Sequence, residues 1–310
     1  MKNRPAAVAI SSFLISIIGL GGCAGSGDPV PPARVSGDLA RSRPIFDGAT
    51  GANLTWSDLL TRVGGVDVVL VGERHDDATG HAVQLALVED ALRARPGGAL
   101  SLEMLERDEQ PLVDDYGDGI LTRDQFATRT FSTNWGASGG WAAWYQPIVD
   151  AAHETGAPVV AANAPRRYVR LARTDGYERL ASLGEPRTSW YDLPHDLDYD
   201  AYLGRFREAM GHGHGEGGMT DEQIEESFRS QLIWDATMAE SIARAHRAGA
   251  APVIHLVGGF HVEFDGGTAQ ELRARASGAR TLVISLVPES ATMLRDEDRD
   301  RADVVVYTGG

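Results

Sequence analysis

Two stretches of the sequence end in Gly-x-x-His, which places a histidine just beyond an apolar run. They are VDVVLVGERH at residues 66–75 and APVIHLVGGFH at residues 251–261. A short apolar run that stops at glycine is typical of a buried parallel strand. Open α/β sheets bind their ligands beyond the carboxyl ends of such strands. We therefore expect His75, His261 and the neighbouring Glu73 to share one composite site.

Further polar residues follow other apolar runs. Glu103 lies inside ALSLEML, and Asn163 follows the run at residues 157–162. Two imidazoles and two carboxylates can form the first shell of a divalent transition metal. They can equally form a metal-free acid–base pair in which a carboxylate orients a histidine. A purely structural role, with Glu73 capping a helix and Glu103 paired to Arg166, also fits the spacing.

The elements that position these residues alternate between strands and helices. The alternation predicts a doubly wound α/β fold: a mostly parallel sheet of about six strands with helices on both faces. The runs at 66–71, 99–102, 158–161 and 252–257 are expected as neighbouring central strands. Helices are expected at 55–63, 76–95, 142–154, 220–249 and 268–276, and residues 107–131 are expected to be helical in two pieces separated by Asp118-Gly119. Further strands are expected at 281–287 and 303–308. His81 and Gln84 fall where the first turn of the second helix faces the site.

One long stretch lacks this regularity. Residues 168–218 are rich in aromatic side chains and contain a Gly-His-Gly-His-Gly run. We interpret them as an insertion of short helices and loops over the carboxyl edge of the sheet.

The charge balance excludes one class of partner. The formal net charge is −15 and the pI is about 5.0. No basic stripe is present to neutralise phosphates, so we expect no nucleic-acid partner.

The amino terminus resembles an export signal. Basic residues precede an apolar stretch of about 15 residues, which is shorter than a membrane span. Cys23, the single cysteine, follows Leu-Gly-Gly as in the lipobox of bacterial lipoproteins. We expect residues 1–23 to be a lipoprotein signal with lipidation at Cys23, residues 24–50 to be a flexible tether, and residues 51–310 to form the α/β domain. A protein so anchored would lie in the bacterial cell envelope, facing the periplasm or the exterior.

The chain also resembles a known family. The stretches VVLVGERHDDATGHAVQLALVEDAL, SLEMLERDEQPLVDDY, WYQPIVDAAHETGAPVVAANAPR, SQLIWDATMAESI and VIHLVGGFHVEFDG are similar to the ChaN family of haem-binding lipoproteins. That family is grouped with the TIKI proteases and, more distantly, with erythromycin esterases. The similar stretches span roughly residues 66–267.

The resemblance implies two different functions. The ChaN family implies a membrane-anchored lipoprotein of haem or iron uptake, with haem held between two protomers and a tyrosine as the haem contact. The TIKI side implies a metal held by His75, His261 and Glu103, with Glu73 beside them. The esterases share the Gly-Glu-x-His form and imply catalysis by Glu73 and His75. Haem-binding uptake protein and metal-dependent hydrolase of a peptide or ester are therefore the two hypotheses.

The insertion supplies the candidate haem contacts. Arg166 and Arg170 belong to a basic cluster beside it and suit the haem propionates, because a guanidinium donates two parallel hydrogen bonds to a carboxylate. The expected haem contacts from aromatic or imidazole side chains are Tyr168, Tyr191 and His212.

Overall fold

The computed structural model describes residues 35–130, 135–136, 139–213 and 219–309. They form an eight-stranded sheet in the order β2-β1-β8-β7-β3-β6-β4-β5. The strands are β1 (Ile45–Asp47), β2 (Asn53–Leu54), β3 (Val68–Glu73), β4 (Ala99–Glu106), β5 (Val159–Asn163), β6 (Val253–Gly258), β7 (Thr281–Val287) and β8 (Val304–Tyr307). All pairs from β8 to β5 are parallel, which confirms the expected doubly wound α/β class.

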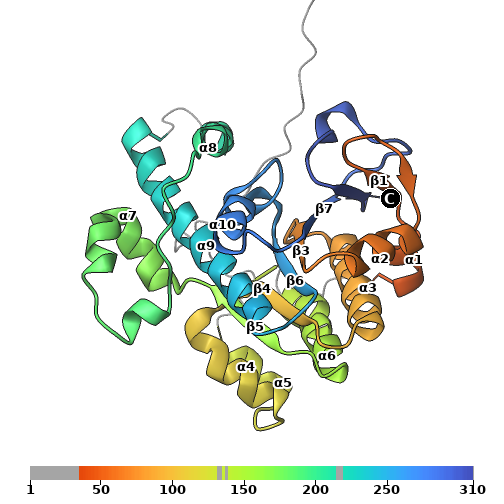
Figure 1. The fold of residues 1–310 in the computed structure, drawn as a ribbon, viewed down its shortest axis with the longest axis horizontal. Helices are drawn as coiled ribbons and strands as arrows, with labels where there is room; N and C mark the ends of the chain where they lie inside the picture. Colours follow the sequence, from red (N-terminus) through yellow and green to blue (C-terminus); the bar gives the residue numbers. More distant parts are fainter. Residues whose placement is uncertain (1–34, 131–134, 137–138, 214–218, 310) are drawn as a thin grey trace, which may run out of the picture.

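Helices cover both faces of this sheet (Figure 1). They are α1 (Gly37–Arg41), α2 (Trp56–Gly64), α3 (Ala78–Ala94), α4 (Gln110–Gly117), α5 (Arg123–Arg129), α6 (Gln146–Glu154), α7 (Arg166–Ala181), α8 (Asp200–Gly213), α9 (Asp221–Arg247) and α10 (Gly267–Arg275). Among the described residues, no helix combines the length and the apolar composition needed to cross a membrane.

Strand β3 shows how the two faces are built. Val69 and Val71 pack into the cluster that contains α3 and α6, while Val68 and Leu70 pack into the cluster of α9 and α10. Successive side chains of a strand point to opposite faces, so a strand buried on both sides reads as a continuous apolar run. Each such side chain, fully buried, contributes about 1.5–3 kcal/mol.

The four strands expected to be neighbours are neighbours. Strand β3 pairs with β6, β6 with β4, and β4 with β5. Strand β5 lies at the edge of the sheet, however, and is not central as expected.

The amino-terminal region differs from the expectation. The tether expected at residues 24–50 includes residues 37–47, which form α1 and β1 in the structure. Strand β1 pairs antiparallel with β8. Ile45 and Phe46 are buried there. A three-residue strand carries too little periodicity to be recognised before its partner, β8, is known.

The insertion follows the prediction in outline. Helices α7 and α8 and the irregular segment between them lie to one side of the sheet in Figure 1, beside α9.

Capping boxes start two of the expected helices, at Thr55 and at Thr220 with Gln223. In each, the threonine side chain accepts a backbone N–H of the first turn.

Candidate functional site

The two Gly-x-x-His stretches meet at the carboxyl edge of the sheet. Strands β3 and β6 are paired in register, with Glu73 opposite Gly258. A Cβ on Gly258 would lie only 3.2 Å from His75 Nε2, and one on Gly72 would lie 3.0 Å from Gly259 Cα. A side chain at either position would crowd its neighbours, because the ring of His75 and the turn after β6 approach the backbone closely.

Glu73 is the hub of the first half of the site. Its side chain is buried, and its Oε1 accepts hydrogen bonds from His75 Nδ1 at 2.7 Å and from the Tyr145 hydroxyl at 2.5 Å. Its Oε2 accepts a bond from Gln84 Nε2. Burial alone would raise the pKa of Glu73, but the His81 and His75 imidazoles and these donors hold it at about 2. Glu73 is thus an ionised carboxylate in the interior.

His75 is oriented by this carboxylate. Desolvation would lower the pKa of His75, yet its hydrogen bond and charge attraction to Glu73 outweigh that effect and raise the pKa to about 9. Its Nδ1 is committed to Glu73, and its Nε2 lies close to Gly258, the residue whose backbone N–H also binds Glu103. The side chain keeps 35% of its surface exposed, and the Trp135 ring packs edge-on against it at 4.9 Å between centroids.

His81 supports the same carboxylate from α3, as expected. A carboxylate can only accept, so the Gln84 amide must turn its nitrogen to Glu73 and its oxygen to His81 Nδ1, at 2.9 Å. The other nitrogen of His81 faces the His75 carbonyl oxygen at 3.3 Å. Both ring nitrogens of His81 therefore face hydrogen-bond acceptors.

The second half of the site repeats the pattern. His261, in the 3-10 turn after β6, donates from Nδ1 to Asp235 Oδ1 at 2.6 Å. Its Nε2 lies 3.6 Å from Glu103 Oε1, and Glu103 Oε2 accepts the Gly258 amide at 2.6 Å. Burial would lower the pKa of His261, but Asp235 and Glu103 together raise it.

The geometry supports acid–base chemistry. Each of the two imidazoles has Nδ1 held by a buried carboxylate, and His261 Nε2 faces Glu103 whereas His75 Nε2 faces Gly258. A carboxylate in this position fixes the tautomer and the ring direction, and it stabilises the protonated ring. Two such pairs around one further carboxylate can donate and accept protons on a bound substrate.

The expected metal centre has no matching ligand group. Within the described parts of the chain, no three or more His, Cys, Asp or Glu side chains are arranged to hold an ion. Glu73 instead holds His75 by a hydrogen bond, and His261 Nε2 lies 3.6 Å from Glu103 Oε1. We therefore derive no step through a metal.

Comparison with protein families assigns the chain. The model of the family described as "Haem-binding uptake, Tiki superfamily, ChaN" matches residues 59–272, which include both Gly-x-x-His stretches. The chain belongs to the ChaN family. No curated protein sequence matches it.

One solved structure of this family agrees with the assignment at the level of fold, and two others are less similar. The structure "Cofacial heme binding to ChaN of Campylobacter jejuni" is 17% identical, with a TM-score of 0.63, covering 85% of this chain and 96% of that one. The type III effector HopBA1 is 12% identical (TM-score 0.47, 87% and 98% covered), and a mutant of the erythromycin esterase EreC in its open conformation is 12% identical (TM-score 0.43, 85% and 82% covered).

The arginines expected to bind propionates in this ChaN-family chain are accessible. Arg166 and Arg170 occupy the first turns of α7 and are exposed. The Arg166 guanidinium lies 5.6 Å from the centroid of the Trp135 ring, which also packs against His75. Its Nε lies 3.6 Å from Glu106 Oε1. The cationic end of α7 therefore borders the acid–base site.

The expected aromatic haem contacts lie differently. Tyr168 and Tyr191 are buried in a small cluster between α7 and α9, with ring centroids 4.9 Å apart, and the Tyr191 hydroxyl donates to the Leu180 carbonyl at 2.7 Å. Neither ring is presented at the surface, so a tyrosinate ligand from this pair would require the cluster to open. His212 lies in α8 but its side chain is outside the described part, as are residues 214–218.

Several site residues escaped the sequence prediction. Asp235 lies within a long helix between apolar neighbours, and Tyr145 sits in a π-helical turn, Trp141–Tyr145, that precedes α6. A buried aspartate flanked by Trp234 and Ala236 was a weak signal for the first, since buried acids need partners. Asn163, also expected at the site, is engaged with the backbone instead. Its Nδ2 donates to the Glu103 carbonyl oxygen at 3.0 Å, and its Oδ1 accepts the Ala164 N–H at 2.9 Å.

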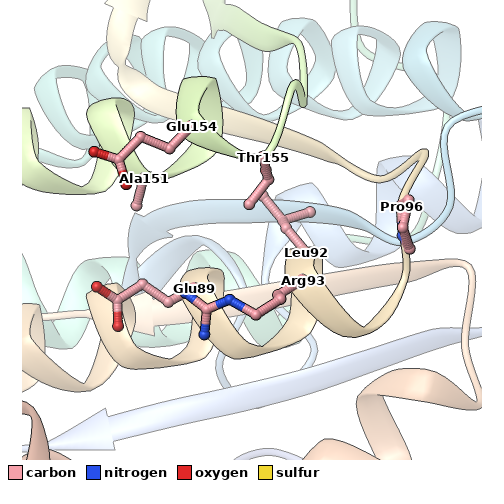
Figure 2. A pocket seen from close by; sticks show the side chains of 7 residues that line it. All are labelled: Glu89, Leu92, Arg93, Pro96, Ala151, Glu154 and Thr155. Carbon is pink, nitrogen blue, oxygen red and sulfur yellow. The ribbon is translucent and has the colours of Figure 1, made fainter.

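A separate pocket lies at the other end of α3. It lies between α3 and α6 (Figure 2). Its volume is about 340 Å³. It is lined by Glu89, Leu92, Arg93, Pro96, Ala151, Glu154 and Thr155. None of these residues belongs to the acid–base site.

Proposed function

We propose that this protein binds haem and serves haem or iron uptake. The observation that carries the proposal is the family match over residues 59–272, which covers the carboxyl edge of the sheet and most of the surrounding helices. The chain's net charge of −15 opposes a ligand with two carboxylates, so local cations must offset it. Arg166 and Arg170 are exposed and lie one helical turn apart, and Arg166 lies beside Trp135.

The double variant Arg166→Ala/Arg170→Ala is expected to weaken haem binding about tenfold or more. Charge-assisted hydrogen bonds are worth about 1.5–3 kcal/mol each, and solvent exposure reduces that value here. The measurement is an absorption titration of the Soret band with haem. The matched control is Arg93→Ala/Arg247→Ala. Both arginines are exposed and lie in the last turns of α3 and α9, near the amino-terminal edge of the sheet and away from the site.

The same titration tests the wider proposal. If the unmutated protein gives no Soret change at micromolar haem, haem binding is refuted. If the double variant binds as tightly as the unmutated protein, only the propionate role is refuted. Light scattering of the same samples tests whether haem promotes a homodimer, as we propose from the cofacial arrangement named for the Campylobacter jejuni structure.

We propose further that lipidated Cys23 anchors the protein in the cell envelope. The support is the basic start, the apolar stretch and the Leu-Gly-Gly-Cys sequence. Fractionation of expressing bacteria should place the full chain with membranes and a Cys23→Ser chain in a soluble fraction. Equal membrane association of both chains would refute the anchor.

A second candidate function is hydrolysis of an ester or peptide. The observation that favours it is the pair of carboxylate–imidazole contacts, Glu73–His75 and Asp235–His261, around Glu103. Haem capture by exposed arginines does not require such a buried arrangement. The test is turnover of a chromogenic ester by the haem-free protein, with His75→Gln as the inactive variant and His246→Gln, outside the site, as the control.

A further inference from the structure

Each carboxylate–imidazole pair of the site has a buried tyrosine behind it. The Tyr145 hydroxyl donates to Glu73, and the Tyr202 hydroxyl donates to Asp235 Oδ2 at 3.0 Å. Both tyrosine side chains are almost completely buried. Burial, together with the facing carboxylate, raises the pKa of each phenol well above its usual value, so each stays a hydrogen-bond donor.

The two tyrosines differ in which oxygen they occupy. Tyr145 donates to Glu73 Oε1, the oxygen that also accepts from His75 Nδ1, and its hydroxyl lies 3.4 Å from that nitrogen. Tyr202 donates to Oδ2 of Asp235, whereas His261 uses Oδ1. Tyr145 therefore shares an acceptor atom with the histidine, and Tyr202 does not.

The local backbone holds Tyr145 in this place. The π-helical turn Trp141–Tyr145 widens the helix just before α6, and such turns are frequent at functional sites. Trp141 Nε1 donates to Gln146 Oε1 at 2.9 Å, which ties the turn to the helix. The Tyr145 ring also packs edge-on against His81, at 4.6 Å between centroids.

The remaining oxygen of Glu73 is fixed as well. Gln84 Nε2 donates to Oε2, and the Gln84 oxygen is held in turn by His81. Both oxygens of the Glu73 carboxylate therefore accept a hydrogen bond from a buried donor, which holds the carboxylate against rotation toward the imidazole. Its direction is decided by Tyr145 and Gln84, and His75 must align with it.

We propose that Tyr145 is a positioning residue that fixes Glu73 and shares its Oε1 with His75, so that His75 keeps Nε2 directed toward Gly258 at the end of β6. The consequence for catalysis rests on the acid–base function proposed above. The hydrogen-bond arrangement itself can be tested whether or not the protein turns over a substrate or binds haem.

The experiment is proton NMR of the full chain in detergent, labelled with nitrogen-15 at histidine and held at one pH. His75→Gln and His261→Gln assign the two hydrogen-bonded Nδ1–H signals. In Tyr145→Phe, the His75 signal is expected to move downfield, since one oxygen then serves one donor in place of two. In Tyr202→Phe, the His261 signal should move much less, because the lost donor occupied the other oxygen.

Two further variants separate positioning from simple structural support. Tyr307→Phe removes another buried hydroxyl that donates to a buried carboxylate, Asp298, outside the site, and should leave the His75 signal in place. Incorporation of 3-fluorotyrosine at position 145 keeps the ring and strengthens the donor, so the His75 signal should move upfield, even if Tyr145→Phe fails to fold. A His75 signal that stays in place with 3-fluorotyrosine, or that moves equally in Tyr307→Phe, would overturn the proposal.

Discussion

Replacing Asp235 by alanine is expected to lower the free energy of unfolding by about 3–5 kcal/mol, the cost typical of removing one partner of a buried ion pair. Asp235 has no exposed surface. It accepts hydrogen bonds from His261 Nδ1 at 2.6 Å, from the Thr268 hydroxyl at 2.7 Å and from the Tyr202 hydroxyl at 3.0 Å. Its loss leaves these donors without an acceptor in a region closed to water.

Urea unfolding followed by circular dichroism measures this change. The matched control is Glu225→Ala on the same helix, α9, where an exposed glutamate lies 3.7 Å from Arg207. An exposed pair at that distance is worth about 0–1 kcal/mol, so the control should unfold close to the unmutated protein. Equal midpoints for Asp235→Ala and Glu225→Ala would show that Asp235 is not a buried anchor of the fold.

The Glu73–His75 pair is expected to contribute most to the free energy of unfolding between about pH 4.5 and 6.5. The folded pKa of His75 is raised to about 9, so its contribution is complete below the ordinary value of 6.5 and is lost as the pH rises toward 9. The folded pKa of Glu73 is lowered to about 2, so its contribution is complete above 4.5 and is lost as the pH falls toward 2.

The two shifts describe one interaction and are not additive. After allowance for the partial exposure of His75, the alkaline loss is on the order of 1–2 kcal/mol. Chemical unfolding at a series of pH values measures it. The His75→Gln protein should lose less stability between pH 6.5 and 9 than the unmutated protein, whereas His246→Gln should retain the full slope. Identical slopes in all three proteins would contradict the proposed pairing.

The main strands and the core of the site followed from sequence because their signals are local. Apolar runs ending in glycine marked β3 and β6, and parallel strands bring their carboxyl ends to one edge. The meeting of Glu73, His75, Glu103 and His261 therefore needed no tertiary information. The positions of His81 and Gln84 followed from helical spacing for the same reason.

The partners of these residues could be found only in the tertiary structure. Asp235 reaches His261 from α9, the helix that precedes β6, and Tyr145 reaches Glu73 from a π-helical turn that hydrophobic periodicity does not predict. Such contacts depend on how helices pack over the sheet, and side-chain type at one position does not encode them.

The same limit explains the remaining differences. A three-residue strand such as β1 joins the main sheet by pairing with β8, which comes from the other end of the chain. Tyr168 and Tyr191 have the composition of a binding surface, but the packing of α7 against α9 buries them together. By itself the sequence determined the order of elements and the residues at the strand ends, since these depend on local pattern. Tertiary packing decided which polar groups face one another and which aromatic rings stay accessible, since those depend on distances between segments that the chain order leaves open.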